Sequence, residues 1–465
     1  MRRKEAEHTA GWRLWAAWVG ARIVAWASRL AGRGGSSLPG RVALWLAPDV
    51  VAAVARQTVG GVVLVTGTNG KTTTAGLVAG MLRTAGRRVA HNRSGANLLP
   101  GIAFALLEAY RPGAPPDTAV LETDEATVPR AAPLVRPRVV LVTNFFRDQL
   151  DRYGELSTTV RYVGTGLEYL GPGGRAVLNA DDPHVAQLGE GVEAVYYGLE
   201  APVESGGPLE DPGDARFCPQ CGTELVYTVR RYAHLGLWRC PGCGARRPTP
   251  QVALVGFEEA GRWLRIRTPA GEWRLPFGLP GVYNLYNAVA AVAAGWVLGL
   301  DAQTMRDGLA SRAVAFGRME GIRFRGREVR LALVKNPTGF NQVLAAVASD
   351  PRPKTLVVAI NDLDADGRDV SWLWDVDLET LWPRARAERW WVTGLRARDM
   401  AVRLKYAGCP PERIAVCEGS PERGVLAALE DEGADPVYVL PTYTALLAVR
   451  RVFEREGAVR PFREG

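Results

Sequence analysis

The stretch that decides the fold is GVVLVTGTNGKTTT, residues 61–74. Its apolar run, Val62 to Val65, predicts a buried strand. The standard P-loop pattern G-x-x-x-x-G-K-[ST] is not met, because Val65 stands where the first glycine would be. The remaining G-x-x-G-K-T still predicts a phosphate loop, since Gly67 and Gly70 can adopt backbone angles that turn N–H groups toward an anion at a helix N-terminus.

The lysine and threonine of this loop are the candidate functional groups. Lys71 supplies a positive charge, and the Thr72 hydroxyl is a ligand suited to Mg²⁺. The helical pattern TTAGLVAGMLRTAG follows at once, which is the context that such a loop needs. The alternative is a strand-to-helix turn that happens to carry a lysine.

Composition narrows the class of protein. The chain has 465 residues, 47% of them hydrophobic, and a net charge of +8, which allows about three domains. No uninterrupted apolar run reaches the roughly 18 residues that suggest a membrane span, and no signal-peptide cleavage pattern follows the basic N-terminus. We therefore expect a cytoplasmic protein, and the positive surplus suits an anionic substrate or a membrane surface.

Four of the six cysteines predict a metal site. Cys218, Cys221, Cys240 and Cys243 form C-x₂-C-x₁₈-C-x₂-C, the spacing of a structural Zn²⁺ site in which the protein fills all four positions. Cys409 and Cys417 are expected to be ordinary thiols.

The pattern of elements predicts the domain organisation. Residues 1–55 carry tryptophans and aliphatic residues at helical spacing, for which core packing is the default and a membrane-surface helix the alternative. Alternating strand-like and helix-like segments predict an α/β domain with a mostly parallel sheet over 56–316. The zinc segment interrupts it as an insertion at 205–250, and a smaller α/β domain is expected over 317–465.

Several polar residues follow predicted strands or open a predicted helix. Glu122, Asp124 and Glu125 end one strand, where a carboxylate could bind Mg²⁺ beside Thr72. A solvated acidic turn is the alternative for Asp124 and Glu125. Asn287 lies near the start of an alanine-rich helix, where its amide could bind a base or cap the helix.

An aspartate-rich stretch lies in the C-terminal domain. NDLDADGRDVSWLWDVD, residues 361–377, holds six aspartates next to two tryptophans. Packing hardly explains so many carboxylates, which favours a functional role for this stretch. A solvated loop without such a role is the alternative.

Taken in order, these motifs resemble the Mur ligase superfamily. TGTNGKTTT, the strand-end Glu122, TNFFRDQLDRYG, YNLYNA and GRMEG follow one another over about 55–320. The Cys₄ insertion, ADGRDVSWLWDVD and PTYTALL are similar to the MurT family, and that resemblance extends over essentially the whole chain. It implies an α/β fold: a Mur ligase-like central P-loop domain with an inserted Cys₄ zinc ribbon, and a C-terminal Rossmann-like domain.

The resemblance also implies a reaction. Such an enzyme is a carbon–nitrogen ligase that uses ATP to activate the α-carboxylate of D-glutamate in the lipid II stem peptide. An acyl phosphate forms, and ammonia displaces the phosphate to give D-isoglutamine.

The same resemblance assigns roles to residues. Asn287 would hold the adenine, Thr72 and Glu122 the Mg²⁺, and Lys71, Glu122 and Asp369 would be catalytic. The nucleotide-binding loop would comprise Gly67, Thr68, Asn69, Gly70, Lys71, Thr72 and Thr73.

Two departures from the superfamily favour ammonia as the nucleophile. Amino-acid-adding Mur ligases have a histidine where Gln149 stands, and commonly a carbamylated lysine in the central domain. No lysine occurs between Lys71 and Lys335, so that carbamate has no residue on which to form.

The ammonia is expected to come from a partner. None of the four histidines lies near Cys409 or Cys417 in sequence, and a glutaminase needs a cysteine activated by a histidine. The resemblance implies a GatD-like glutamine amidotransferase subunit, whose triad Asp369, or alternatively Asp366, would complete.

Other functions remain as alternatives. One is an amino-acid-adding Mur ligase or a folylpolyglutamate synthetase-like ligase, against which the zinc insertion argues. Another is nucleic-acid binding through the arginine-rich ribbon, but one basic insertion does not explain an ordered set of ligase motifs. We expect lipid II as substrate, no nucleic-acid partner, and peripheral contact with the inner face of the membrane as an alternative to a purely cytoplasmic location.

Overall fold

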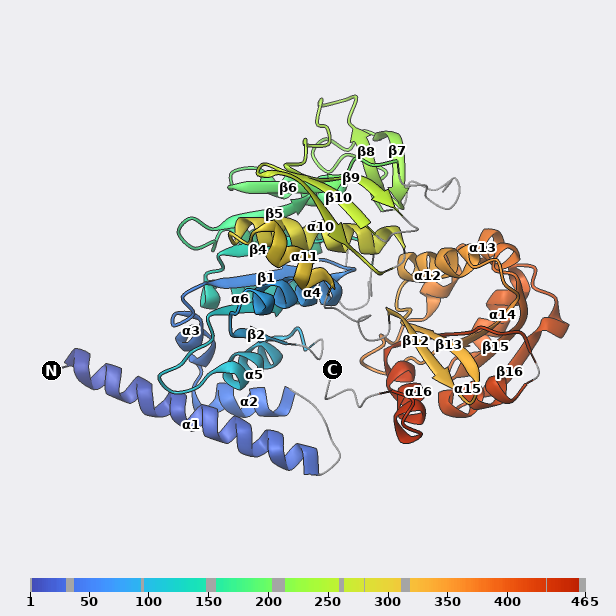
Figure 1. The fold of residues 1–465 in the computed structure, drawn as a ribbon, viewed down its shortest axis with the longest axis horizontal. Helices are drawn as coiled ribbons and strands as arrows, with labels where there is room; N and C mark the ends of the chain where they lie inside the picture. The colour runs from blue at the N-terminus through green and yellow to red at the C-terminus, as the bar shows by residue number, and fades with distance from the viewer. Residues whose placement is uncertain are drawn as a thin grey trace. The chain divides into compact units, whose positions relative to one another are not determined.

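The structure is a computed structural model with two compact units (Figure 1). The division falls between helix α11 (Ala302–Ala310) and strand β12 (Arg318–Phe324). The structure describes residues 2–30, 37–92, 96–147, 156–202, 214–258, 263–279, 281–310, 318–431 and 433–459.

A nine-stranded mixed sheet forms the centre of the first unit. Its order is β11-β10-β9-β6-β5-β4-β1-β3-β2. The strands from β9 to β2 are parallel, which confirms the mostly parallel sheet predicted from the sequence. The antiparallel edge of β10 and β11 was not predicted. The strands are β1 (Val62–Thr66), β2 (Val89–His91), β3 (Thr118–Glu122), β4 (Val139–Val142), β5 (Arg175–Asn179), β6 (Ala194–Leu199), β9 (Val252–Glu258), β10 (Trp263–Thr268) and β11 (Gly271–Pro276).

Helices cover both faces of this sheet. Alternate residues of β1 point to opposite sides of the sheet, and all of them are buried, so each face needs a covering layer. Val63 and Val65 pack in the core that holds α4 (Lys71–Thr84), α10 (Val282–Val297) and α11. Val62 and Leu64 pack in the opposite core. That core contains α1 (Arg2–Leu30), α2 (Ser37–Leu46), α3 (Val50–Ala55), α5 (Leu99–Ala109), α6 (Val128–Val135) and α8 (Leu156–Leu167).

The N-terminal helices belong to the first unit and are not a separate body. Leu14, Ala17 and Ala21 of α1 lie in the same buried cluster as the β1 strand. Core packing, the default expectation for 1–55, is therefore confirmed for one side of α1. Among the described residues, no helix is long and apolar enough to cross a membrane.

The cysteine-bearing insertion contains an antiparallel hairpin of β7 (Val226–Tyr232) and β8 (Leu235–Arg239). Short elements elsewhere in this unit are η1 (Glu125–Thr127), α9 (Pro183–Ala186) and η2 (Gln187–Gly189).

The second unit is built on a six-stranded sheet with the order β12-β13-β17-β14-β15-β16. The strands from β13 to β16 are parallel, which confirms the predicted α/β alternation, and β12 is antiparallel at the edge. Its other elements are β13 (Arg327–Ala332), α12 (Pro337–Ser349), β14 (Lys354–Ala359), η3 (Ser371–Asp375), α13 (Leu378–Arg384), β15 (Ala387–Gly394), α14 (Ala397–Tyr406), η4 (Pro411–Arg413), β16 (Ile414–Glu418), α15 (Pro421–Glu430), β17 (Val437–Pro441) and α16 (Tyr443–Arg455).

Candidate active site

The loop between β1 and α4 depends on its two glycines. Gly67 has φ +113° and Gly70 has φ +86°, in the region that side chains with a Cβ rarely adopt. A Cβ at Gly67 would collide with the Thr143 hydroxyl, and one at Gly70 would collide with the Asn287 side-chain oxygen. Both positions therefore require glycine for conformation and for space.

The segment after β4 holds the loop in place. The Asn69 N–H donates to Asn144 Oδ1 at 2.9 Å, and Asn144 Nδ2 donates back to the Asn69 carbonyl at 3.1 Å. Similarly, the Phe146 N–H donates to the Thr68 hydroxyl at 3.0 Å. Asn144 is thus a clamp on the loop, a role that sequence reasoning missed although its place after an apolar strand was a signal.

Lys71 is buried and ion-paired. Its Nζ lies 2.6 Å from the Gly67 carbonyl and 3.2 Å from both carboxylate oxygens of Glu125. Each of the two charged side chains is only 9% exposed. The alternative of a solvated acidic turn is wrong for Glu125, and it is also wrong for Asp124, which is buried and accepts from the Ala126 N–H at the start of η1.

Glu122 is buried at the same edge of the sheet as the loop. It ends β3 and pairs in register with Val65 of β1. Asn92 fixes its backbone, accepting from the Glu122 N–H at 2.8 Å and donating to the Glu122 carbonyl at 2.7 Å. Thr72, the other proposed Mg²⁺ ligand, is half-buried in the first turn of α4, and Thr73 beside it is buried.

Asn287 ties the start of α10 to the start of α4. Its Oδ1 accepts from the Thr74 hydroxyl at 3.3 Å, and its Nδ2 donates to Asn284 Oδ1 at 3.2 Å. The side chain is buried and lies against Gly70. The structure therefore brings Asn287 to the base of the loop.

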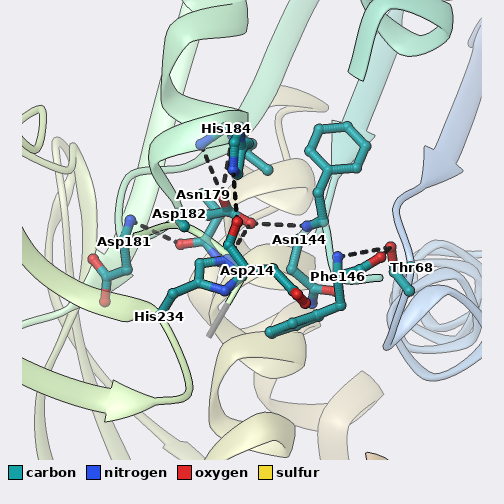
Figure 2. A network of polar contacts seen from close by, with 12 residues as sticks. Thr68, Asn144, Phe146, Asn179, Asp181, Asp182, His184, Asp214 and His234 are labelled. Carbon is teal, nitrogen blue, oxygen red and sulfur yellow. Dashed lines mark hydrogen bonds and ion pairs between the residues drawn. The ribbon is translucent and has the colours of Figure 1, made fainter. Parts of the chain in front are cut away.

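Behind the loop lies a buried polar network centred on Asp182 (Figure 2). Asp182 Oδ2 accepts from the Phe145 N–H at 2.8 Å and lies 3.4 Å from His234 Nε2, while Oδ1 accepts from the His184 N–H at 2.9 Å. Burial raises the pKa of Asp182, but His234 and the hydrogen bonds outweigh burial, so this pKa is lowered on balance. Burial lowers the pKa of His184.

This network links the hairpin to the loop. The His234 ring, between β7 and β8, lies 4.7 Å from the Phe146 ring, and Phe146 in turn binds Thr68. Neither histidine had been given a role from sequence, because their shared contact with Asp182 arises only when segments far apart in the chain meet.

The neighbouring Asp181 anchors the insertion. It accepts from Arg247 Nε and from the Tyr286 hydroxyl, each at 2.6 Å, and burial raises its pKa. Trp238 of β8 donates to the Ala180 carbonyl at 3.0 Å. Trp238 and Arg247 thus tie the insertion to the two residues that follow β5, and Asp181 is bonded in turn to Tyr286 of α10.

The four predicted ligand cysteines converge. The Sγ atoms of Cys218, Cys221, Cys240 and Cys243 all lie within 4.8 Å of one another. Two Sγ–Sγ distances, 3.7 Å for Cys218–Cys243 and 3.4 Å for Cys221–Cys240, are close to the roughly 3.8 Å separation expected of thiolates around a tetrahedral ion with about 2.3 Å metal–sulfur bonds. The donor set fits a closed structural metal site.

The two aspartates considered for the partner's triad differ in exposure. Asp369 is exposed, and its oxygens accept from the Ser371 N–H at 2.8 Å and hydroxyl at 2.9 Å, which lowers its pKa. Asp366 is buried and accepts from the N–H and hydroxyl of Thr444. Only Asp369 of the two presents its carboxylate to solvent. Gln149, which the resemblance predicts to differ from the histidine of amino-acid-adding ligases, lies outside the described residues.

Comparison with known proteins places the chain in a family. Profiles for the Mur ligase middle domain and for the MurT ligase C-terminal region match residues 65–207 and 333–446. The chain is 36% identical over 433 residues to the lipid II isoglutaminyl synthase (glutamine-hydrolyzing) subunit MurT of Streptococcus pneumoniae, covering 92% of this chain and 94% of that one. It is 35% identical to the Staphylococcus aureus N315 protein of the same name, covering 85% and 88%.

Solved structures share the fold. A pseudomurein peptide ligase type C from Methanothermus fervidus has a TM-score of 0.65 at 23% identity, covering 85% of this chain and 79% of that one. MurF ligase from Thermotoga maritima in complex with ADP has a TM-score of 0.60 at 16% identity, covering 88% and 83%. With a Mur ligase fold and this similarity along nearly its whole length, the chain belongs to the MurT family.

Proposed function

We propose that this chain is the synthetase subunit of a lipid II isoglutaminyl synthase. It would use ATP to convert the α-carboxylate of D-glutamate in the lipid II stem peptide into an amide. The observation that carries the proposal is the similarity over 92% of the chain to a subunit of that name. The buried lysine and carboxylates beside a glycine loop supply the chemistry that such a ligase needs.

The loop residues would bind the phosphates of ATP. Backbone N–H groups of residues 67–73 open α4 and can face an anion at its N-terminus. Lys71 already lies between a carbonyl of the loop and Glu125, so a phosphate could replace the carboxylate as its counterion. This exchange would place one positive charge on the transferred phosphoryl group.

Thr72 and Glu122 are the proposed Mg²⁺ ligands. A hydroxyl and a carboxylate are hard oxygen donors of the kind that this ion prefers. When bound, Mg²⁺ neutralises negative charge on the phosphoryl oxygens. Glu122 is held ready for this role by the two hydrogen bonds that Asn92 makes to its backbone. Asn287 is proposed to contact the adenine.

Ammonia is the proposed nucleophile. Attack of ammonia on the acyl phosphate forms the C–N bond, releases phosphate and leaves a proton to be removed. Because residues 72–334 contain no lysine, the central region has no residue on which the carbamate used by amino-acid-adding relatives could form.

A GatD-like amidotransferase is the proposed source of ammonia. Asp369 is proposed to orient and charge-stabilise the partner's histidine. Its exposure and its lowered pKa support this choice over Asp366, since a carboxylate that serves another chain must be accessible and ionised.

The finer architecture follows the same family. We propose a central domain over 56–316 with a zinc ribbon inserted at 205–250, a Rossmann-like domain over 317–465, and Zn²⁺ held by the four clustered cysteines. Residues 1–55 are proposed as a helical segment attached to the central domain. The protein would work in the cytoplasm, at the inner face of the membrane that carries its substrate.

Mass spectrometry of lipid II tests the function. The chain is incubated with ATP, Mg²⁺ and ammonium chloride, with and without the glutaminase and glutamine. Replacement of the α-carboxyl hydroxyl by an amino group is expected with ammonium, and Lys71→Ala should abolish it. Unchanged lipid II in both formats, or addition of an amino acid in place of ammonia, would overturn the proposal.

A further inference from the structure

Helix α1 is apolar on two opposite faces. Leu14, Ala17, Ala21 and Ala25 are buried. Four large apolar side chains are instead more than half exposed: Trp12 (58%), Trp15 (57%), Ile23 (59%) and Trp26 (63%). At 100° per residue these four fall within an arc of about 80° on the side away from the buried residues. We name them the tryptophan face.

The neighbouring helix also exposes large apolar side chains. Helix α2 packs beside α1 (Figure 1), and it exposes Trp45 (80%) and Leu38. Scattered single apolar residues are normal on a protein surface, but a contiguous group of this kind marks an interaction site. The exposed tryptophans are not needed for the core, which the opposite face of α1 already supplies.

The charged residues of these two helices after His8 are all basic, while Glu108 of α5 lines a cavity together with Arg22. Residues 8–48 contain five arginines and neither aspartate nor glutamate. Arg13, Arg22 and Arg41 are exposed on the two helices, and the Arg22 guanidinium lies 4.7 Å from the Trp18 ring centroid. Tryptophan beside arginine is the combination that suits the boundary between lipid headgroups and acyl chains.

We propose that the tryptophan face docks on an anionic lipid bilayer. The tryptophans would enter the headgroup region while the arginines meet anionic lipid phosphates, with α1 lying in the plane of the membrane. No described helix can span a bilayer, so the contact is peripheral. The inference rests on the proposed function in one respect: a lipid-anchored substrate gives the docking its purpose.

Flotation with vesicles tests this docking. The full chain with its amidotransferase partner is mixed with vesicles of phosphatidylglycerol and phosphatidylethanolamine, or of phosphatidylcholine alone. We expect anionic vesicles to bind the complex more tightly, with binding weakened by salt. The variant Trp12→Ser/Trp15→Ser/Trp26→Ser should partition onto the anionic vesicles at least about tenfold more weakly, because each substitution removes apolar area that the bilayer would otherwise bury. Trp374→Ser, which changes an exposed tryptophan of the second unit (53% exposed), is the matched control and should bind as the parent does.

Charge reversal provides the second arm. Arg13→Glu or Arg22→Glu should weaken binding to anionic vesicles at least about fivefold. Arg306→Glu, at an exposed arginine of α11, should change it much less. Because all these side chains are exposed, each variant should keep the melting temperature of the parent. An unchanged melting temperature would show that the variants fold.

The outcomes separate docking from catalysis. Amidation of lipid II in vesicles should fall in the triple variant, whereas amidation of a short-chain soluble analogue should not. Equal flotation of parent and triple variant, no preference for anionic lipid, or a dimer in solution that the triple variant abolishes would each overturn the docking. Failure to amidate either substrate would instead refute the proposed function and leave the flotation result standing.

Discussion

Replacing Gly70 by alanine should damage the loop through two separable effects. The first is conformational: alanine at φ +86° costs about 1–2 kcal/mol. The second is steric: the new Cβ meets the Asn287 side-chain oxygen. Displacing that buried amide breaks its hydrogen bonds to Thr74 and Asn284, which adds about 1–3 kcal/mol. The expected total is about 2–5 kcal/mol of unfolding free energy.

Two control variants separate the conformational cost from the steric cost. Gly86 has φ +78°, and a Cβ there would meet nothing within 4 Å, so Gly86→Ala should show the conformational cost alone. In an Asn287→Ala background the clash at Gly70 is gone, and Gly70→Ala should cost only about 1–2 kcal/mol. Urea unfolding followed by circular dichroism gives the free energies, and calorimetry with ATP gives the affinity. ATP affinity should fall for Gly70→Ala and stay constant for Gly86→Ala.

The reasoning would be wrong if Gly70→Ala destabilised the protein no more than Gly86→Ala does. It would also be wrong if the cost of Gly70→Ala were the same with and without the Asn287 amide. Either result would mean that the contact between the loop and the start of α10 carries no energy.

Four further results are expected. Glu125→Gln should destabilise the protein by about 3 kcal/mol in urea titrations, because it leaves the buried ammonium of the loop lysine without its carboxylate. Asp369→Asn should abolish amidation driven by glutamine while amidation driven by ammonium persists, whereas Asp366→Asn should lower the melting temperature because its buried carboxylate accepts hydrogen bonds from the start of α16. Hydrogen bonds from a neighbouring arginine are the main reason why the pKa of Asp350 lies below its ordinary value of 3.8. The ionised carboxylate therefore stabilises the fold fully above pH 3.8, and this stabilisation is lost as the pH falls through the lowered pKa. Unfolding curves of Asp350→Asn should accordingly converge with those of the parent in acid. Chelation of metal from the cysteine cluster should lower the melting temperature and release zinc measurable by a colorimetric dye; unchanged melting would speak against a structural ion.

The elements that carry strong local signals could be predicted from the sequence. The apolar run before Gly67 predicts β1, and the cysteine spacing predicts the cluster, because both signals are contained in short stretches of chain. The position of Glu122 at a strand end could likewise be predicted, since parallel strands finish at a common edge.

What remained unpredicted depends on contacts between distant segments. The pairing of Lys71 with Glu125 joins residues 54 positions apart, and the contact of His234 with Asp182 depends on where the inserted hairpin folds back. The Asn144 clamp belongs to the same class. The exposure of Trp12 and its neighbours was also open, because a helix that is apolar on both faces gives no local signal of which face is buried.

Transfer of oxygen from substrate to phosphate tests the central claim most directly. Lipid II carrying a heavy-oxygen label in the α-carboxylate of D-glutamate is incubated with the chain, its amidotransferase partner, ATP, Mg²⁺ and glutamine. Activation of that carboxylate as an acyl phosphate predicts that one labelled oxygen appears in the released phosphate for each amide formed, and that Lys71→Ala yields neither product. Amidated lipid II accompanied by unlabelled phosphate would contradict the account, because the carboxylate oxygen would not have been phosphorylated.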